Sequence, residues 1–228
     1  MIKNVLFDFA GTIADLSPSS EDMLCSYVDK FCDFKLDKER AREAFACLDK
    51  HMFYSSVKVT DFDSKSKYYQ HYNDMIIKSL GISDRVDNSE NQLFKYFASH
   101  DRHWVLKSDV KDTFTTLKEK GFKVGIISNF DSKLLSIVDR LGISDLVDYL
   151  HISQDEGYEK PQLEFYQSFF ERHGLKANES SYCGDSYILD FLPVQSINIA
   201  KPLIIDPYGN YASRDEIIKN ISDVLKVL

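Results

Sequence analysis

The sequence predicts an α/β fold in which a parallel sheet is interrupted by a helical insert. Short apolar runs that are typical of buried parallel strands recur along the chain, and helical patterns separate most of them. This alternation indicates βαβ units. With 228 residues, the chain is long enough to bury a large core and to carry a smaller second unit.

The strand-like runs are short and rich in aliphatic residues. They lie at 4–9, 123–128, 149–153, 181–184 and 202–206. Helical patterns fill most of the intervals between the later runs and follow the last one. They span 110–120 before Gly121, 132–141 before Gly142, 162–173 before Gly174, and 215–227. A glycine just past the last periodic residue is a frequent signal for a helix end.

The long interval after the first predicted strand has a different character. Between residues 17 and 102 there is no strand pattern, and apolar residues recur at helical spacing. The four helical stretches are 21–34, 38–53, 66–80 and 89–99. We therefore expect a sheet-containing core formed by 1–16 and 103–228, and a helical domain formed by 17–102.

Composition and charge narrow the classes of function. The formal net charge of −8 disfavours non-specific nucleic-acid binding, and an anionic substrate would need a metal ion or a lysine to offset that field. No apolar run approaches the ~20 residues that span a bilayer. The four cysteines show no paired metal-ligand spacing, and the start MIKNVLFDF is neither a signal nor a transit peptide. We expect a soluble cytoplasmic protein with a metal ion and without nucleic-acid or membrane partners.

Asp8 is the first candidate for chemistry. It follows the apolar run Val5-Leu6-Phe7 and opens the sequence DFAGT, where the first strand would end in a turn. In open α/β sheets, ligands bind outside the carboxyl ends of the strands, and a carboxylate there can attack phosphorus or carbon to form a covalent ester. Asp8 is therefore the expected nucleophile.

Further polar residues stand at or beyond the ends of later apolar runs. They are Thr12 in the first turn, Ser128 and Asn129 at the end of GIISN, Lys160 before Pro161, and Asp185 and Asp190 in GDSYILD. Each alone is more often a structural turn or cap residue. Together they match what phosphoryl transfer needs: a nucleophile, donors for the equatorial oxygens, a cation, and a carboxylate that holds Mg²⁺. Asp8, Ser128, Lys160 and Asp185 supply these four roles.

This ordered series resembles the haloacid dehalogenase-like hydrolase superfamily, over nearly the whole core. Asp8 to Thr12 are similar to its first motif, Ser128 to its second, Lys160 to its third, and Asp185 with Asp190 to its fourth. The resemblance is greatest to the branch with a helical cap inserted after the first motif. It implies a Rossmann-like, doubly wound parallel sheet, a mobile cap over the site, and an aspartyl-ester intermediate. The segment FLPVQSINIAKP after Asp190 departs from the family pattern, so we expect a short or shifted helix there.

Ala10 is a second departure from the pattern of the family's phosphatases. In them, the residue two positions after the nucleophile is an acid that protonates the leaving group and then activates water. A methyl group does neither. The backbone carbonyl of this position binds the metal in the family, so the resemblance implies a Mg²⁺ site formed by Asp8, the Ala10 carbonyl, Asp185 and Asp190.

Three functions are compatible with Ala10. The leading one is Mg²⁺-dependent hydrolysis of a small phosphorylated metabolite through an aspartyl phosphate. The second is P–C or C–halogen hydrolysis. Phosphonoacetaldehyde hydrolases share Ala at this position and keep the metal, but they need a Schiff-base lysine from the cap, for which Lys50 is a candidate. Dehalogenases need no metal, and the Gly184-Asp185 turn, which is of the metal-binding type, argues against a dehalogenase function. The third is a catalytically weak protein that binds a phosphorylated ligand or a protein partner.

Overall fold

The computed structural model describes residues 1–32, 34–54, 65–86, 92–209, 211 and 215–228, apart from the side chains of 47–54, 65, 66 and 68. Within these residues the chain divides into two compact units. The core unit comprises Met1–Asp15 and Trp104–Leu228, and the inserted unit comprises Leu16–His103. Each unit has its own hydrophobic core.

The core unit is built on a six-stranded parallel sheet with the strand order β5-β4-β1-β6-β7-β8. Each strand in this sheet pairs with its neighbours in parallel, so the carboxyl ends of all six strands meet at one edge. The first strand lies inside the sheet, between β4 and β6. The strands are β1 (Asn4–Phe7), β4 (Lys123–Ser128), β5 (Tyr149–Ile152), β6 (Ser180–Gly184), β7 (Lys201–Ile205) and β8 (Ile217–Ile218).

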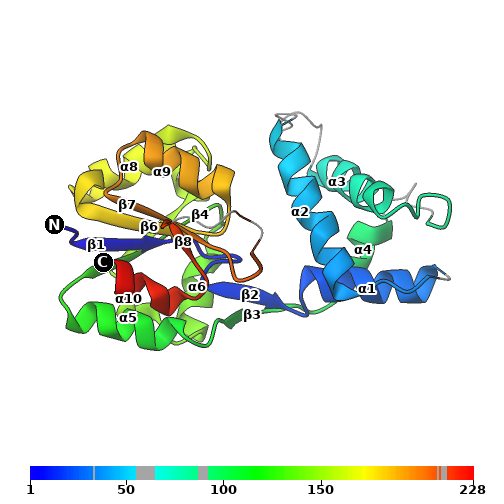
Figure 1. Cartoon of the computed structure of the whole chain (residues 1–228), viewed down its shortest axis with the longest axis horizontal. Helices are drawn as coiled ribbons and strands as arrows, with labels where there is room; N and C mark the ends of the chain where they lie inside the picture. Colours follow the sequence, from blue (N-terminus) through cyan, green and yellow to red (C-terminus); the bar gives the residue numbers. More distant parts are fainter. Residues whose placement is uncertain (33, 55–64, 87–91, 210, 212–214) are drawn as a thin grey trace. The chain divides into compact units, whose positions relative to one another are not determined.

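Helices cover both faces of this sheet, as Figure 1 shows. Alternate residues of β1 point to opposite faces: Phe7 packs in one apolar cluster with Phe114, and Leu6 packs in another with Phe165. The helices of this unit are α5 (Val110–Glu119), α6 (Lys133–Arg140), α7 (Ser153–Glu156), α8 (Leu163–His173), α9 (Leu192–Ser196) and α10 (Val224–Val227). The predicted doubly wound, Rossmann-like parallel sheet is confirmed.

The inserted unit is helical in its described part. Its helices are α1 (Ser20–Phe31), α2 (Lys38–Tyr54), α3 (Lys65–Ser79) and α4 (Gln92–Ser99). Their apolar stripes share one buried cluster that includes Leu24, Val28, Ile76 and Leu93. The first helix begins at a capping box, in which the Ser19 side chain accepts from the Asp22 backbone amide.

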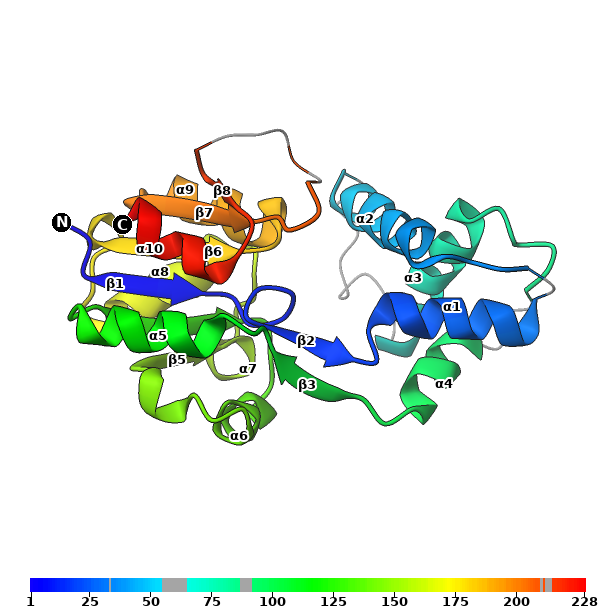
Figure 2. The same cartoon turned by 60° about the horizontal axis from the view of Figure 1, so that its bottom comes forward.

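Two short strands that the sequence does not predict accompany the two chain crossings between the units. They are β2 (Ala14–Ser17) and β3 (His103–Leu106), which pair with each other as a separate two-stranded sheet (Figure 2). The Lys107 amide donates to the Ile13 carbonyl at 3.0 Å just beyond them. Neither stretch has a clear apolar alternation, because each is only partly buried.

The predicted helix over 215–227 is wrong. Ile217 and Ile218 instead form β8, which extends the sheet by pairing with Ile204 and Ile205. The helix α10 starts only after a 3₁₀ turn that a capping box between Asn220 and Asp223 begins. After Asp190 the expectation of a short helix is correct, since α9 has five residues.

Candidate active site

Asp8 lies immediately after β1, at the carboxyl edge of the sheet. Its amide donates to the Cys183 carbonyl at 2.9 Å, which continues the pairing between β1 and β6 by one residue. The residue is buried, with 7% of its surface exposed. An interior strand therefore fixes the backbone of the candidate nucleophile, and the chain then turns away from the sheet.

The turn after Asp8 folds around Gly11. Gly11 has a φ of +77°, which a residue with a Cβ adopts only with strain, and a Cβ added there would lie 2.4 Å from Oδ2 of Asp185. Thr12 closes the turn, and its Oγ1 is 3.4 Å from both Oδ2 of Asp8 and Oδ1 of Asp185. Glycine at position 11 thus lets this turn approach the second acid closely.

Lys160 joins two of the acids. Its ammonium donates to Oδ1 of Asp8 at 2.5 Å and to Oδ1 of Asp190 at 2.7 Å, and only 4% of the residue is exposed. Asn129 holds the backbone of Lys160 on both sides: its Oδ1 accepts from the Lys160 amide at 2.7 Å, and its Nδ2 donates to the Lys160 carbonyl at 3.1 Å. The end of β4 therefore positions the lysine through Asn129.

Asp190 is fixed by several donors. Besides Lys160, the Tyr182 hydroxyl donates to its Oδ1 at 2.8 Å and the Ser186 amide to its Oδ2 at 3.1 Å. It lies in a π-helical turn, η4 (Tyr187–Phe191), which follows β6. A Cβ on Gly184 would stand 2.2 Å from Cγ of Asp190, so only glycine fits at the end of this strand.

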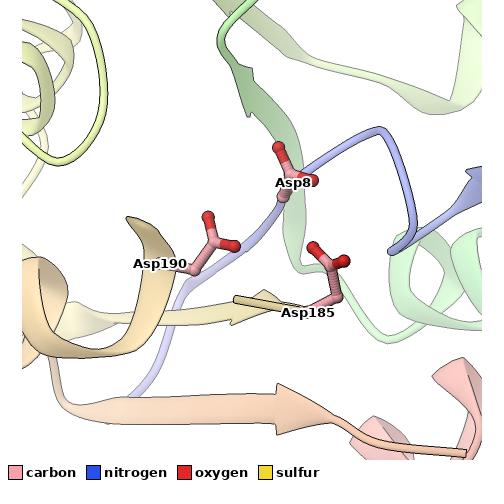
Figure 3. Close-up of side chains that lie close together, drawn as sticks. All are labelled: Asp8, Asp185 and Asp190. Carbon is pink, nitrogen blue, oxygen red and sulfur yellow. The ribbon is translucent and has the colours of Figure 1, made fainter. Parts of the chain in front are cut away.

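The three acids form one group. Oxygen atoms of Asp8, Asp185 and Asp190 lie within 4.8 Å of one another, and Figure 3 shows their carboxylates around a common space. The ammonium of Lys160 forms ion pairs with two of them, Asp8 and Asp190. Three carboxylates around one ammonium carry a net negative charge, and oxygen donors of this kind suit a hard divalent cation such as Mg²⁺. The residues therefore fit the expected metal.

Electrostatics support the same conclusion. Burial raises the pKa of Asp8; Lys160 opposes the rise and Asp190 adds to it. Burial, and then the charges of Asp8 and Asp190, raise the pKa of Asp185 well above its usual range, although its exposure lets water offset part of the rise. Burial alone would lower the pKa of Lys160, but Asp190 and Asp8 outweigh it and raise that pKa. Without a further cation nearby, the ionised forms of Asp8 and Asp185 are therefore disfavoured, and a bound divalent cation would favour them.

Ser128 and Ala10 complete the set of residues from the first and second motifs. Ser128 is the buried last residue of β4, the strand beside β1. Ala10 forms an isolated bridge with Ala14, and its methyl group packs against the core. The side chain of Ala10 has no atom that could donate or accept a proton.

The sequence did not single out three residues that shape the site. Tyr182 lies inside an apolar run and resembles a core residue. Gly11 is conspicuous only once its φ is known. Lys107 donates from its ammonium to the Gly11 carbonyl over a separation of 96 residues, which no local pattern reveals. The side chain of Lys50, the candidate Schiff-base lysine, lies outside the described residues.

Comparison with known proteins gives consistent matches. The family model described as haloacid dehalogenase-like hydrolase matches residues 41–201. A glyceraldehyde 3-phosphate phosphatase of Methanocaldococcus jannaschii is 28% identical over 241 residues, covering 100% of this chain and 99% of that protein. The human haloacid dehalogenase-like hydrolase domain-containing protein 3 is 27% identical over 116 residues, covering 51% of this chain and 46% of that protein. The chain thus spans about half the length of several curated relatives that it matches.

A solved structure shares the fold. The HAD phosphatase from Thermococcus onnurineus superposes with a TM-score of 0.59 at 20% sequence identity, covering 99% of this chain and 97% of that one.

Among the described residues, no helix is both long enough and apolar enough to cross a membrane.

Proposed function

Because the chain belongs to the haloacid dehalogenase-like hydrolase family, we propose that it is a Mg²⁺-dependent phosphatase of a small phosphorylated metabolite. The observation that carries the proposal is the ammonium of Lys160 between Asp8 and Asp190, with Asp185 completing the acidic group. The full-length similarity to a protein named glyceraldehyde 3-phosphate phosphatase supports a phosphate ester as the substrate class.

In the proposed reaction, Asp8 is the nucleophile. Its Oδ1 accepts from Lys160, so we assign the attack on phosphorus to Oδ2, which lies near Thr12. The Asp8–phosphorus bond forms as the bond from phosphorus to the ester oxygen breaks, and the leaving oxygen keeps the electron pair. Water then attacks phosphorus, which releases inorganic phosphate and restores the Asp8 carboxylate.

The other residues bind and orient the phosphoryl group. We assign Ser128 and Asn129, at the end of β4, and Thr12 to the polar surround of its oxygens, with Lys160 as the fixed cation. Asp8, the Ala10 carbonyl, Asp185 and Asp190 would hold Mg²⁺, which supplies positive charge against the oxygens of the phosphoryl group. Asp190 already accepts from three donors, so we expect Asp8 and Asp185 to contribute most of the binding.

The test is release of inorganic phosphate from a panel of small phosphate esters, with and without Mg²⁺. We expect Mg²⁺-dependent release that Asp8→Asn abolishes, because an amide is a poor nucleophile of nearly the same shape. Asp155→Asn, at an exposed position in α7, is the matched control and should leave release unchanged. Full turnover by purified Asp8→Asn would remove Asp8 from this role.

Ala10 favours a second candidate reaction, hydrolysis of a P–C or C–halogen bond. Expulsion of halide needs no proton, so the missing acid would cost nothing there. Incubation with a haloacid or with phosphonoacetaldehyde, followed by measurement of halide or phosphate release, tests this candidate. Release from either compound at a rate above that of every phosphate ester would replace the phosphatase proposal.

A further inference from the structure

A second lysine reaches the turn that carries Ala10. The ammonium of Lys107 donates to the Gly11 carbonyl, and the Lys107 amide donates to the Ile13 carbonyl at 3.0 Å. Both the backbone and the side chain of Lys107 are therefore attached to the turn that follows the nucleophile. The residue is half-buried, and all of these atoms belong to the core unit.

Gly11 connects this lysine to the acidic group. The space beside its Cα is occupied by Asp185, whose Oδ2 is 2.4 Å from where a Cβ would stand. In Figure 3 the turn after Asp8 runs on the Asp185 side of the site. Lys107 is thus bonded to the residue that lies against Asp185.

The two lysines differ in what holds them. Lys160 is enclosed between two carboxylates, so its charge is already committed to Asp8 and Asp190. The ammonium of Lys107 instead donates to a neutral carbonyl, and a lysine ammonium has three donor hydrogens. A hydrogen bond from an ammonium to a negatively charged oxygen is stronger than one to a neutral carbonyl. An oxygen that gains negative charge beside this turn would therefore attract Lys107.

We propose that Lys107 is a catalytic residue that donates a hydrogen bond to the leaving oxygen of the substrate. It would stabilise by its charge the oxygen that Ala10 has no acid to protonate. The inference rests on the proposed phosphatase function and adds a residue that the family resemblance does not assign.

The leaving alcohol takes its proton from water, so ester cleavage needs no proton from the turn that carries Ala10. As the Asp8–phosphorus bond forms, the ester bond breaks and its electron pair stays on the leaving oxygen, which accepts the hydrogen bond from Lys107. That oxygen takes a proton from water as the alcohol leaves, and hydroxide remains. In the second half, water attacks phosphorus and loses a proton, which neutralises this hydroxide.

The inference predicts a dependence on the leaving group. Lys107→Met should slow phosphate release from glycerol phosphate by ~100-fold, the loss typical of removing one donor to a developing oxyanion. Release from para-nitrophenyl phosphate should fall far less, because its phenolate needs little stabilisation. Lys107→Arg keeps a cationic donor and should retain most of the alkyl ester activity. Lys111→Met, at an exposed position in α5, is the matched control.

A double variant distinguishes two roles of Lys107, stabilising the leaving oxygen and holding the shape of the turn. Adding Ala10→Asp to Lys107→Met supplies an acid and should restore alkyl ester hydrolysis, whereas a turn that has lost its shape would not recover. Equal losses on both substrates, or no loss on either, would overturn the role of Lys107. Absence of Mg²⁺-dependent release by the unmodified protein, or full turnover by Asp8→Asn, would instead overturn the phosphatase function itself.

Discussion

Asp185→Asn is expected to stabilise the metal-free protein while removing its response to Mg²⁺. The oxygens of Asp8, Asp185 and Asp190 lie within 4.8 Å of one another. At that distance two unit charges repel by about 3.5 kcal/mol at an effective dielectric constant of ~20, and by about 0.9 kcal/mol in bulk water. An amide at position 185 removes this repulsion and keeps nearly the same shape.

The size of the effect follows from the exposure of Asp185. The two negative charges of Asp8 and Asp190 and the one positive charge of Lys160 leave about one net negative charge that repels Asp185. Because Asp185 is exposed, the repulsion energy lies near the value for bulk water. We therefore expect the free energy of unfolding of metal-free protein to rise by ~1 kcal/mol at neutral pH. Unmodified protein should gain about 2.7 kcal/mol at a Mg²⁺ concentration 100 times its Kd, and the variant should gain almost nothing.

The pH dependence has a definite sign. The folded-state pKa values of Asp8 and Asp185 are raised, so their contribution to stability is fully present below the unfolded value of about 4 and is lost as pH rises through the folded values. Metal-free protein should therefore lose stability with rising pH in that window, and Asp185→Asn should lose less.

Urea unfolding with and without Mg²⁺, at a series of pH values, measures all three effects. Asp155→Asn, an exposed substitution of the same chemistry, is the control for general charge removal. A variant that is less stable than the unmodified protein without metal, or that retains the full Mg²⁺ response, would refute the reasoning. The first result would mean that Asp185 is not repelled by its acidic neighbours, and the second would mean that Asp185 does not bind the metal.

Three further substitutions probe the site. Lys160→Met should lower the free energy of unfolding by ~3–5 kcal/mol in urea titrations, because it leaves two buried carboxylates without their cation; a loss below ~1 kcal/mol would contradict this. Gly11→Ala should weaken Mg²⁺ binding, measured by calorimetry, because the added methyl group displaces Asp185. Gly121→Ala is the control, since Gly121 also has a positive φ but has nothing within 4 Å of the added Cβ. Equal Mg²⁺ affinity in both variants would count against the role of Gly11. Ala10→Asp should speed alkyl phosphate hydrolysis by up to ~10²–10⁴-fold in phosphate-release assays, and no gain on any ester would exclude a missing acid as the limiting factor.

The sequence predicts the parts of the fold that depend on local pattern. Residues 123–128 form the predicted strand at the predicted bounds, because burial on both faces makes the run continuously apolar. The order of polar residues at strand ends led to Asp8, Lys160, Asp185 and Asp190, and the structure brings these four together. Parallel strands explain this, since their carboxyl ends share one edge.

Features that depend on distant partners were not predictable. The strand β8 has only two residues and exists because Ile204 and Ile205 offer a free edge. The pair β2 and β3 forms between segments separated by the whole insert. The contact of Lys107 with Gly11 likewise requires the chain to return to the first turn. A local pattern carries no information about such long-range pairing.

The most direct test of the proposed function is a search for the covalent intermediate. Position 10 has no carboxylate that could take a proton from water, so the aspartyl phosphate at Asp8 should be hydrolysed slowly. Acid quench during turnover of para-nitrophenyl phosphate, followed by mass spectrometry of peptides, should then find one phosphoryl group on the peptide that contains Asp8, and none in Asp8→Asn. A phosphoryl group on another residue, or active turnover with no phosphorylated peptide at any quench time, would contradict Asp8 as the nucleophile.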